Sequence, residues 1–169
     1  MKWTAKNIAL CAVLAALALG LSTLEWLFPI SLLVPLPGVK LGLANIVTVF
    51  ALYQLGAGAA LAILLTRCLL GGLFAGNLSA MLFSVLGGLT AMLVMIFLRR
   101  LPKLSVYGVS IGGAAAHNIG QMAAAVITLG STMVLGYLPF LLAVSLFTGA
   151  LTGFITALLL RATRHIRFH

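Results

Sequence analysis

The sequence predicts an all-α integral membrane protein, a bundle of six transmembrane helices. Of its 169 residues 63% are hydrophobic and only 7% are charged, whereas about 25% are charged in an average soluble domain. Ten Lys and Arg residues and one acidic residue cannot cover the surface of a soluble protein of this length. Lipid must therefore surround most of the chain. The basic residues, moreover, gather at the ends of the apolar segments.

Glycine, proline and polar breaks divide the chain into six apolar segments. These cover residues of about 5–28, 42–55, 57–75, 78–98, 106–129 and 137–161. A membrane-spanning helix needs about 20 apolar residues, so the second segment is expected to be tilted or incomplete. The second and third can also be read as one long bent helix, which would leave five spans. No soluble domain fits between the breaks, and residues 1–169 are expected to form a single membrane domain.

The basic residues at the segment ends decide between five and six spans. With six spans the eight residues named next fall on one side of the membrane and only Lys40 is left in an outer loop, whereas five spans would divide the eight between the two sides. They are Lys2, Lys6, Arg99, Arg100, Lys103, Arg161, Arg164 and Arg167. Because Lys and Arg collect on the cytoplasmic side, we expect six spans and two cytoplasmic termini in a bacterial plasma membrane.

The loop of residues 29–41 is then on the outer side. Its prolines, Pro29, Pro35 and Pro37, fix φ and remove backbone donors, so the loop should be stiff and largely non-helical. Its other residues are mostly apolar, which favours contact with the bundle or the lipid over water. The loop is either a cap over a cavity or an interfacial connection, and the sequence leaves both open.

Small residues indicate where helices approach closely, because packing in lipid depends on close backbone contact. The fifth segment carries a ladder with a spacing of four residues, formed by Gly108, Gly112, Ala116, Gly120 and Ala124. It should therefore be a central helix. Ala12 and Ala16, also four residues apart, give the first segment a similar narrow face.

Arg67 is the most informative polar residue within the apolar segments. Placed near the middle of the third segment, it is about 15 Å from either interface at 1.5 Å per residue. Glu25, the only acidic residue, is at the outer end of the first segment, where Lys40 is its better-placed partner. Arg67 should then face backbone carbonyls, water or an anionic substrate; a structural role and a ligand-binding role both remain open.

A second polar cluster lies in the fifth segment, where His117, Asn118 and Gln121 are three or four residues apart and so share one side of a helix. These residues suit recognition of a polar ligand by hydrogen bonds, although they can also link helices structurally. With Asn45, which makes the second segment more polar, and with Arg67 and Lys40, they are the candidate substrate-binding residues.

The sequence lacks the motifs of several kinds of catalytic and cofactor-binding site. The chain has no P-loop motif, no Asp and no Cys or His set with zinc spacing. We therefore expect no catalytic residues, no metal site and no bound cofactor. The net charge of +9 suits anionic lipid headgroups better than nucleic acid, because the basic residues flank apolar segments.

Two stretches resemble a known family: Pro37 to Thr48, PGVKLGLANIVT, and Ala115 to Gln121, AAHNIGQ. Both are similar to the Gx transporter family, also named heptaprenyl diphosphate synthase component I. That family is related to the S components of energy-coupling factor (ECF) vitamin transporters, which are six-helix substrate-binding subunits. The resemblance covers nearly the whole chain. It implies a ligand site beneath the loop 29–41 and a contact of Ala12 and Ala16 with a transmembrane coupling subunit.

The resemblance suggests a membrane subunit that binds a small polar or anionic vitamin-like molecule and works with an ECF-type coupling subunit and an ATPase pair. The synthase name is not expected to mean catalysis, because prenyl diphosphate synthases hold Mg²⁺ with Asp-rich motifs that this chain lacks. Two alternatives remain. One is a non-catalytic membrane accessory of prenyl diphosphate, quinone or redox metabolism, and the other is a stand-alone secondary carrier.

Overall fold

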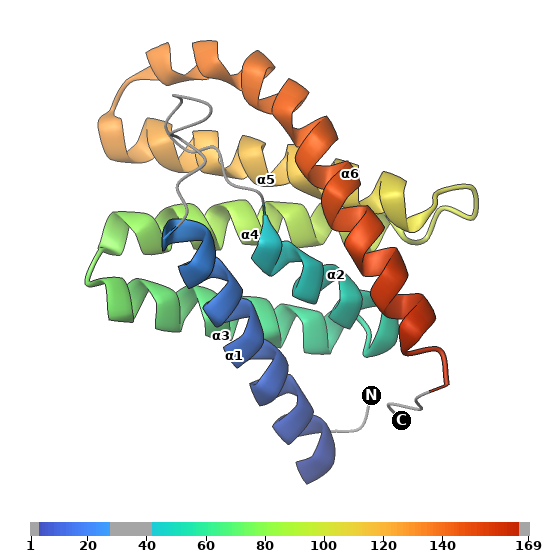
Figure 1. Cartoon of the computed structure of the whole chain (residues 1–169). Coiled ribbons are helices and arrows are strands. Elements are labelled where there is room, and N and C mark those ends of the chain that lie inside the picture. Colours follow the sequence, from blue (N-terminus) through green and yellow to red (C-terminus); the bar gives the residue numbers. More distant parts are fainter. Residues whose placement is uncertain (1–3, 28–41, 166–169) are drawn as a thin grey trace.

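A computed structural model of the chain describes residues 4–27 and 42–165. Within these residues every regular element is helical and no β-strand occurs, so the all-α prediction is confirmed. The elements are α1 (Ala5–Leu27), α2 (Leu43–Gln54), α3 (Ala57–Ala75), α4 (Leu78–Leu98), α5 (Val106–Leu129), the 3-10 helix η2 (Thr132–Tyr137) and α6 (Leu138–Ala162) (Figure 1). The six α-helical ranges expected from the sequence differ from these by at most one residue at either end. The loop 29–41, with Lys40, lies outside the described residues.

Four of the described segments are long and apolar enough to cross a membrane. They are Ala5–Glu25, Ala57–Ala75, Leu78–Leu98 and the stretch Thr132–Ala162, in which η2 runs directly into α6. Helix α5 has 24 residues and is long enough to cross a membrane. It is not one of the four, because His117, Asn118 and Gln121 lower its mean hydropathy. Helix α2 has 12 residues and is therefore about 18 Å long at 1.5 Å per residue, shorter than the ~30 Å hydrocarbon core. Together these features are those of a membrane protein.

The helices form two crossing layers. Helices α3, α4 and α5 run side by side, and α1, α2 and α6 lie across them (Figure 1). Helix α4 packs against α3 and α5, and α6 packs against α5 and α2. The short helix α2 lies between α1 and α6 and also contacts α3. Three neighbours therefore bury most of its side chains.

Glycine residues allow α5 to approach both of its neighbours closely. A Cβ atom added to Gly120 would lie 2.6 Å from the carbonyl oxygen of Leu86 on α4. One added to Gly149 of α6 would lie 2.5 Å from the Cα of Ile111 on α5. At the α4–α5 contact the Thr90 hydroxyl also donates to the carbonyl of Ala116, at 2.9 Å. Gly112, Ala116 and Gly120 in the ladder of small residues thus face α4; the spacing had predicted a close contact but not which helix makes it.

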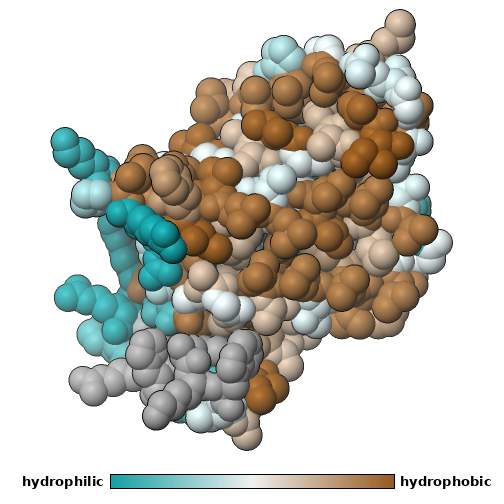
Figure 2. Space-filling view, turned by 180° about the vertical axis from the view of Figure 1, so that it is seen from behind, coloured by the Kyte–Doolittle hydropathy of each residue, from teal (hydrophilic) through white to brown (hydrophobic). Residues whose placement is uncertain are grey.

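Basic side chains are exposed at one end of the bundle. The loop between α4 and α5 carries Arg99, Arg100 and Lys103, and the end of α6 carries Arg161 and Arg164. These two segments lie at the same end of the molecule (Figure 1). Figure 2 shows the hydrophilic atoms gathered at one end of the face it presents, with apolar atoms over most of the remainder. A long apolar surface with a charged end is what a lipid bilayer requires.

Candidate functional site

The end of α1 is joined to the start of α2 by a charged hydrogen bond. The backbone N–H of Gly42, the residue before α2, donates to Oε1 of Glu25 at 2.6 Å. Gly42 has a φ of +77°, in the left-handed region that favours glycine. A carboxylate at this position is stabilised by the positive end of the α2 dipole. The expected pairing of Glu25 with Lys40 falls outside the described residues.

Arg67 of α3 reaches the first turn of α2. Its side chain is only 9% exposed, and Nη2 donates to Oδ1 of Asn45 at 3.4 Å. Its Nε is buried and has no hydrogen-bond partner among the described residues. No carboxylate in this part of the chain pairs with the guanidinium either. A buried charge that meets a single neutral amide is expensive unless another group compensates it.

A hydroxyl group from α6 completes this group of residues. A Cβ atom on Gly42 would lie 3.6 Å from Nδ2 of Asn45 and 3.8 Å from Oγ1 of Thr152. Thr152 donates to the carbonyl of Thr148 at 2.8 Å, so its oxygen can still accept a hydrogen bond. We call Glu25, Gly42, Asn45, Arg67 and Thr152 the Arg67 cluster.

Thr152 was not among the residues expected from the sequence, although a signal for it exists. Hydroxyl residues recur along α6 with helical spacing, at Ser145, Thr148, Thr152 and Thr156, and all but Thr148 are buried. Such a stripe indicates a polar face turned toward the bundle. The spacing does not show which helices the stripe contacts. In the structure α6 packs against α2 and α5.

The polar residues of α5 turn toward two different helices. A Cβ atom on Gly87 of α4 would lie 2.9 Å from the side chain of Gln121 and 3.0 Å from that of His117. These two side chains therefore pack on the same glycine of α4. Asn118 instead faces α6, where its Nδ2 donates to the carbonyl of Leu141 at 2.8 Å. Asn118 thus makes the interhelical hydrogen bond that was the alternative to a ligand contact.

Ala12 and Ala16 lie on the exposed side of α1. Next to them a groove of ≈ 220 Å³ runs between α1 and α3. It is lined by Ile8, Cys11, Ala12, Ala15, Ala62, Ile63 and Thr66. Except for Thr66 the lining is apolar and mostly small. This face can therefore accommodate close contact with another apolar surface in the membrane.

The described residues offer hydrogen-bond donors and acceptors but few groups for chemistry. They contain no set of three or more His, Cys, Asp or Glu side chains that could hold a metal ion. The Arg67 cluster combines a buried cation, an amide, a hydroxyl and a helix N-terminus at which the carboxylate of Glu25 already accepts the N–H of Gly42. Such a set can bind an anionic or strongly polar group at Arg67, because the guanidinium favours negative charge.

Comparison with known proteins assigns the chain to a family. No curated protein and no solved structure gives a significant match. Residues 14–159, which include α2 to α5 whole and most of α1 and α6, match the family described as heptaprenyl diphosphate synthase component I. This helical membrane protein therefore belongs to the heptaprenyl diphosphate synthase component I family.

Proposed function

We propose that this protein is a membrane-embedded subunit that binds a small polar or anionic, vitamin-like molecule for uptake. The observation that carries the proposal is Arg67, which is 9% exposed, has one neutral partner and has a buried Nε without any partner among the described residues. An anionic group on a ligand would provide the missing compensation. In this proposal Arg67 and Asn45 make the principal contacts with the ligand.

Three features support a transport role over a catalytic one. The protein has no Asp and one Glu, and that Glu25 already accepts the N–H of Gly42. The start of α2 follows directly on the loop 29–41, so a ligand could reach the Arg67 cluster from the side of that loop. The exposed Ala12 and Ala16 face leaves room for a coupling subunit, which an ATPase pair would energise.

The proposed orientation has six spans, with both termini in the cytoplasm of a bacterial plasma membrane. It is supported by the position of Arg99, Arg100, Lys103, Arg161 and Arg164 at one end of the bundle, since basic residues favour the cytoplasmic side. Helix α2 is too short to cross the bilayer alone.

A second candidate function follows from the description of the family. The protein could be a non-catalytic membrane accessory of prenyl diphosphate metabolism, in which the Arg67 cluster would receive a diphosphate group. Both candidates assign the same chemistry to Arg67. They differ in the size and the apolar character of the molecule that carries the anionic group, and in the protein partners.

Affinity purification of the full chain in mild detergent tests both candidates. Mass spectrometry of the bound small molecules should identify a water-soluble anionic ligand in the wild type that is lost in Arg67→Gln and retained in the control Arg164→Gln. Arg164 is exposed, so the control removes the same charge without touching the Arg67 cluster. Equal ligand content in the two variants would refute the assignment of Arg67.

The proteins that copurify distinguish the candidates. An ATPase pair with a membrane coupling subunit supports uptake, and substitution of Ala12 and Ala16 by Leu should release that partner by crowding the interface. A copurifying prenyltransferase supports the accessory role instead. Transport by the purified chain alone in liposomes, driven by protons or sodium, would contradict both and indicate a secondary carrier.

A further inference from the structure

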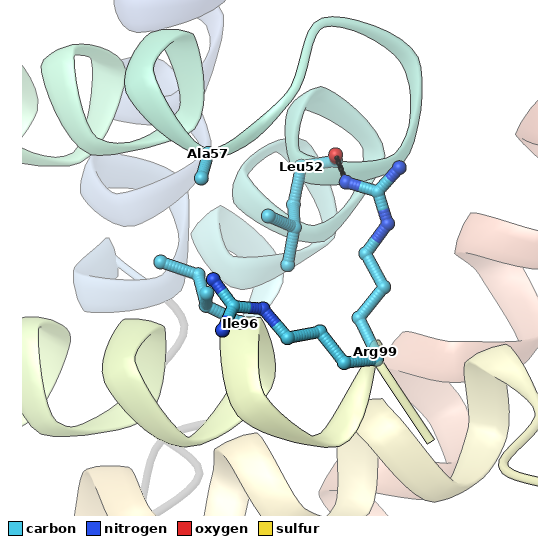
Figure 3. A pocket seen from close by; sticks show the side chains of 5 residues that line it. Leu52, Ala57, Ile96 and Arg99 are labelled. Carbon is cyan, nitrogen blue, oxygen red and sulfur yellow. Dashed lines mark hydrogen bonds between the residues drawn. The ribbon is translucent and has the colours of Figure 1, made fainter. Parts of the chain in front are cut away.

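A second pocket lies at the basic end of the bundle, and none of its lining residues belongs to the Arg67 cluster. It has a volume of ≈ 210 Å³ and is lined by Leu52, Ala57, Ile96, Arg99 and Arg100. The lining comes from the end of α2, the start of α3 and the end of α4. Figure 3 shows the Arg99 side chain reaching across the pocket to the backbone of Leu52. Two guanidinium groups thus border one small space.

Arg99 caps the C-terminal end of α2. Its guanidinium donates to the carbonyl of Leu52 and, at 3.4 Å, to that of Tyr53. It also lies over the Tyr53 ring, with Cζ 5.0 Å from the ring centroid. The last carbonyl groups of a helix lack intrahelical donors and carry its negative dipole end. Arg99 therefore has a structural role, and it also keeps a positive charge beside the pocket.

Arg100 has no such role. It is exposed, and its guanidinium makes no hydrogen bond to any described residue. The start of α3 is also without a cap, because the residue before the helix is Gly56 and supplies no side chain. The first-turn N–H groups of Ala57, Gly58 and Ala59 have no acceptor in the described segments. The pocket thus combines the Arg100 guanidinium with the uncapped start of α3, where Ala57 is part of the lining, and both features favour an anion.

The size and the position of the pocket favour a lipid headgroup. Pockets for whole small molecules usually measure about 300–1,000 Å³, so ≈ 210 Å³ suits one group of a molecule that continues outside. Leu93 and Phe97 near the end of α4 are 67% and 63% exposed, and they precede Arg100, in the turn after the helix, by seven and three residues. Their apolar side chains are therefore available to an acyl chain.

We propose that this pocket binds the phosphate group of an anionic phospholipid, with the phosphate at Arg100 and the start of α3 and an acyl chain along Leu93 and Phe97. The site lies at the end of α4, one of the helices long enough to cross a membrane, and so at headgroup depth. Basic pockets between helices on the cytoplasmic side favour anionic lipids. This proposal does not depend on what the Arg67 cluster binds.

Native mass spectrometry of the full chain tests the proposal, with phosphatidylglycerol, phosphatidylcholine and inorganic phosphate as probes. The wild type should retain one phosphatidylglycerol in preference to phosphatidylcholine. Arg100→Gln should weaken that binding about tenfold, as expected for the loss of one charged hydrogen-bonding group. Lys103→Gln, which removes the same charge from the same loop but not from the pocket lining, should change it less than twofold.

Two further measurements, one on a second variant and one with a competing anion, make each outcome decisive. Arg100→Lys should recover part of the affinity, which separates loss of the charge from misfolding. Millimolar inorganic phosphate should not displace the lipid, because it lacks the acyl chain. Equal weakening by Arg100→Gln and Lys103→Gln would overturn the proposal in favour of a diffuse charge effect. Displacement by inorganic phosphate would overturn the lipid assignment and indicate a site for free phosphate.

Discussion

The contact between α5 and α6 gives the sharpest test of how the bundle is packed. Gly149 of α6 meets backbone atoms of α5, and an added Cβ would lie 2.5 Å from the Cα of Ile111 and 3.0 Å from the carbonyl oxygen of Ser110. Backbone atoms cannot rotate away as a flexible side chain can. Substitution Gly149→Ala should therefore push the two helices apart.

The size of the effect follows from the distances. Carbon atoms pack at about 3.5–4.0 Å, so a contact at 2.5 Å requires a separation of about 1 Å. Overpacking costs about 1–3 kcal/mol, and a rigid backbone places this case near 3 kcal/mol. The gain in helix propensity from Gly to Ala returns about 1 kcal/mol. The net loss is about 2 kcal/mol, equivalent to roughly 30-fold in the folding equilibrium.

The assay is unfolding in mixed dodecylmaltoside and SDS micelles, followed by far-UV circular dichroism. Gly20→Ala is the matched control, because Gly20 is in the interior of α1 and an added Cβ would meet no atom within 4 Å. The control should be neutral or more stable by up to about 1 kcal/mol. If Gly149→Ala unfolds at the same SDS fraction as Gly20→Ala, the packing of α5 on α6 is not as described.

Substitutions at three other positions test local features of the structure by the same unfolding assay. Asn118→Leu removes the hydrogen bond to the carbonyl of Leu141 and should cost about 0.6 kcal/mol, the average for such bonds in membranes; a cost above about 2 kcal/mol would indicate a larger role. Gly42→Ala should cost about 1 kcal/mol through strain at positive φ rather than through crowding, and Gly42→Asn should cost less. Arg99→Gln should destabilise the protein by about 1–3 kcal/mol, because two carbonyls at the end of α2 lose a charged donor; no change would show that water satisfies them equally well.

Much of the fold could be read from the sequence because its breaks are chemically clear. Gly76 and Gly130 end α3 and α5 in the left-handed conformation. Asn77 and Ser105 cap the starts of α4 and α5. Glycine, asparagine and serine favour these positions for local reasons. The helix η2 was not predicted, although Ser131 caps it in the same way, because its mostly apolar residues run directly into α6.

The candidate site was only partly predictable. The expectation that Arg67 would lack an acidic partner needed only the residue count, since the sequence has one carboxylate side chain. Its contact with Asn45 could not be read from the sequence, because the two residues are on different helices. Spacing alone grouped His117, Asn118 and Gln121, but in the bundle Asn118 faces α6 and the other two face α4.

The sequence by itself therefore determined that the chain is a helical membrane protein and where each of its α-helices begins and ends, to within one residue. These properties depend on hydropathy and on local capping, which are readable residue by residue. Only the tertiary structure decided which polar groups meet. The rotation and crossing of each helix are set by contacts such as Gly149 on Ile111, and a rotation of one residue, about 100°, is enough to turn Asn118 toward α6 and His117 toward α4.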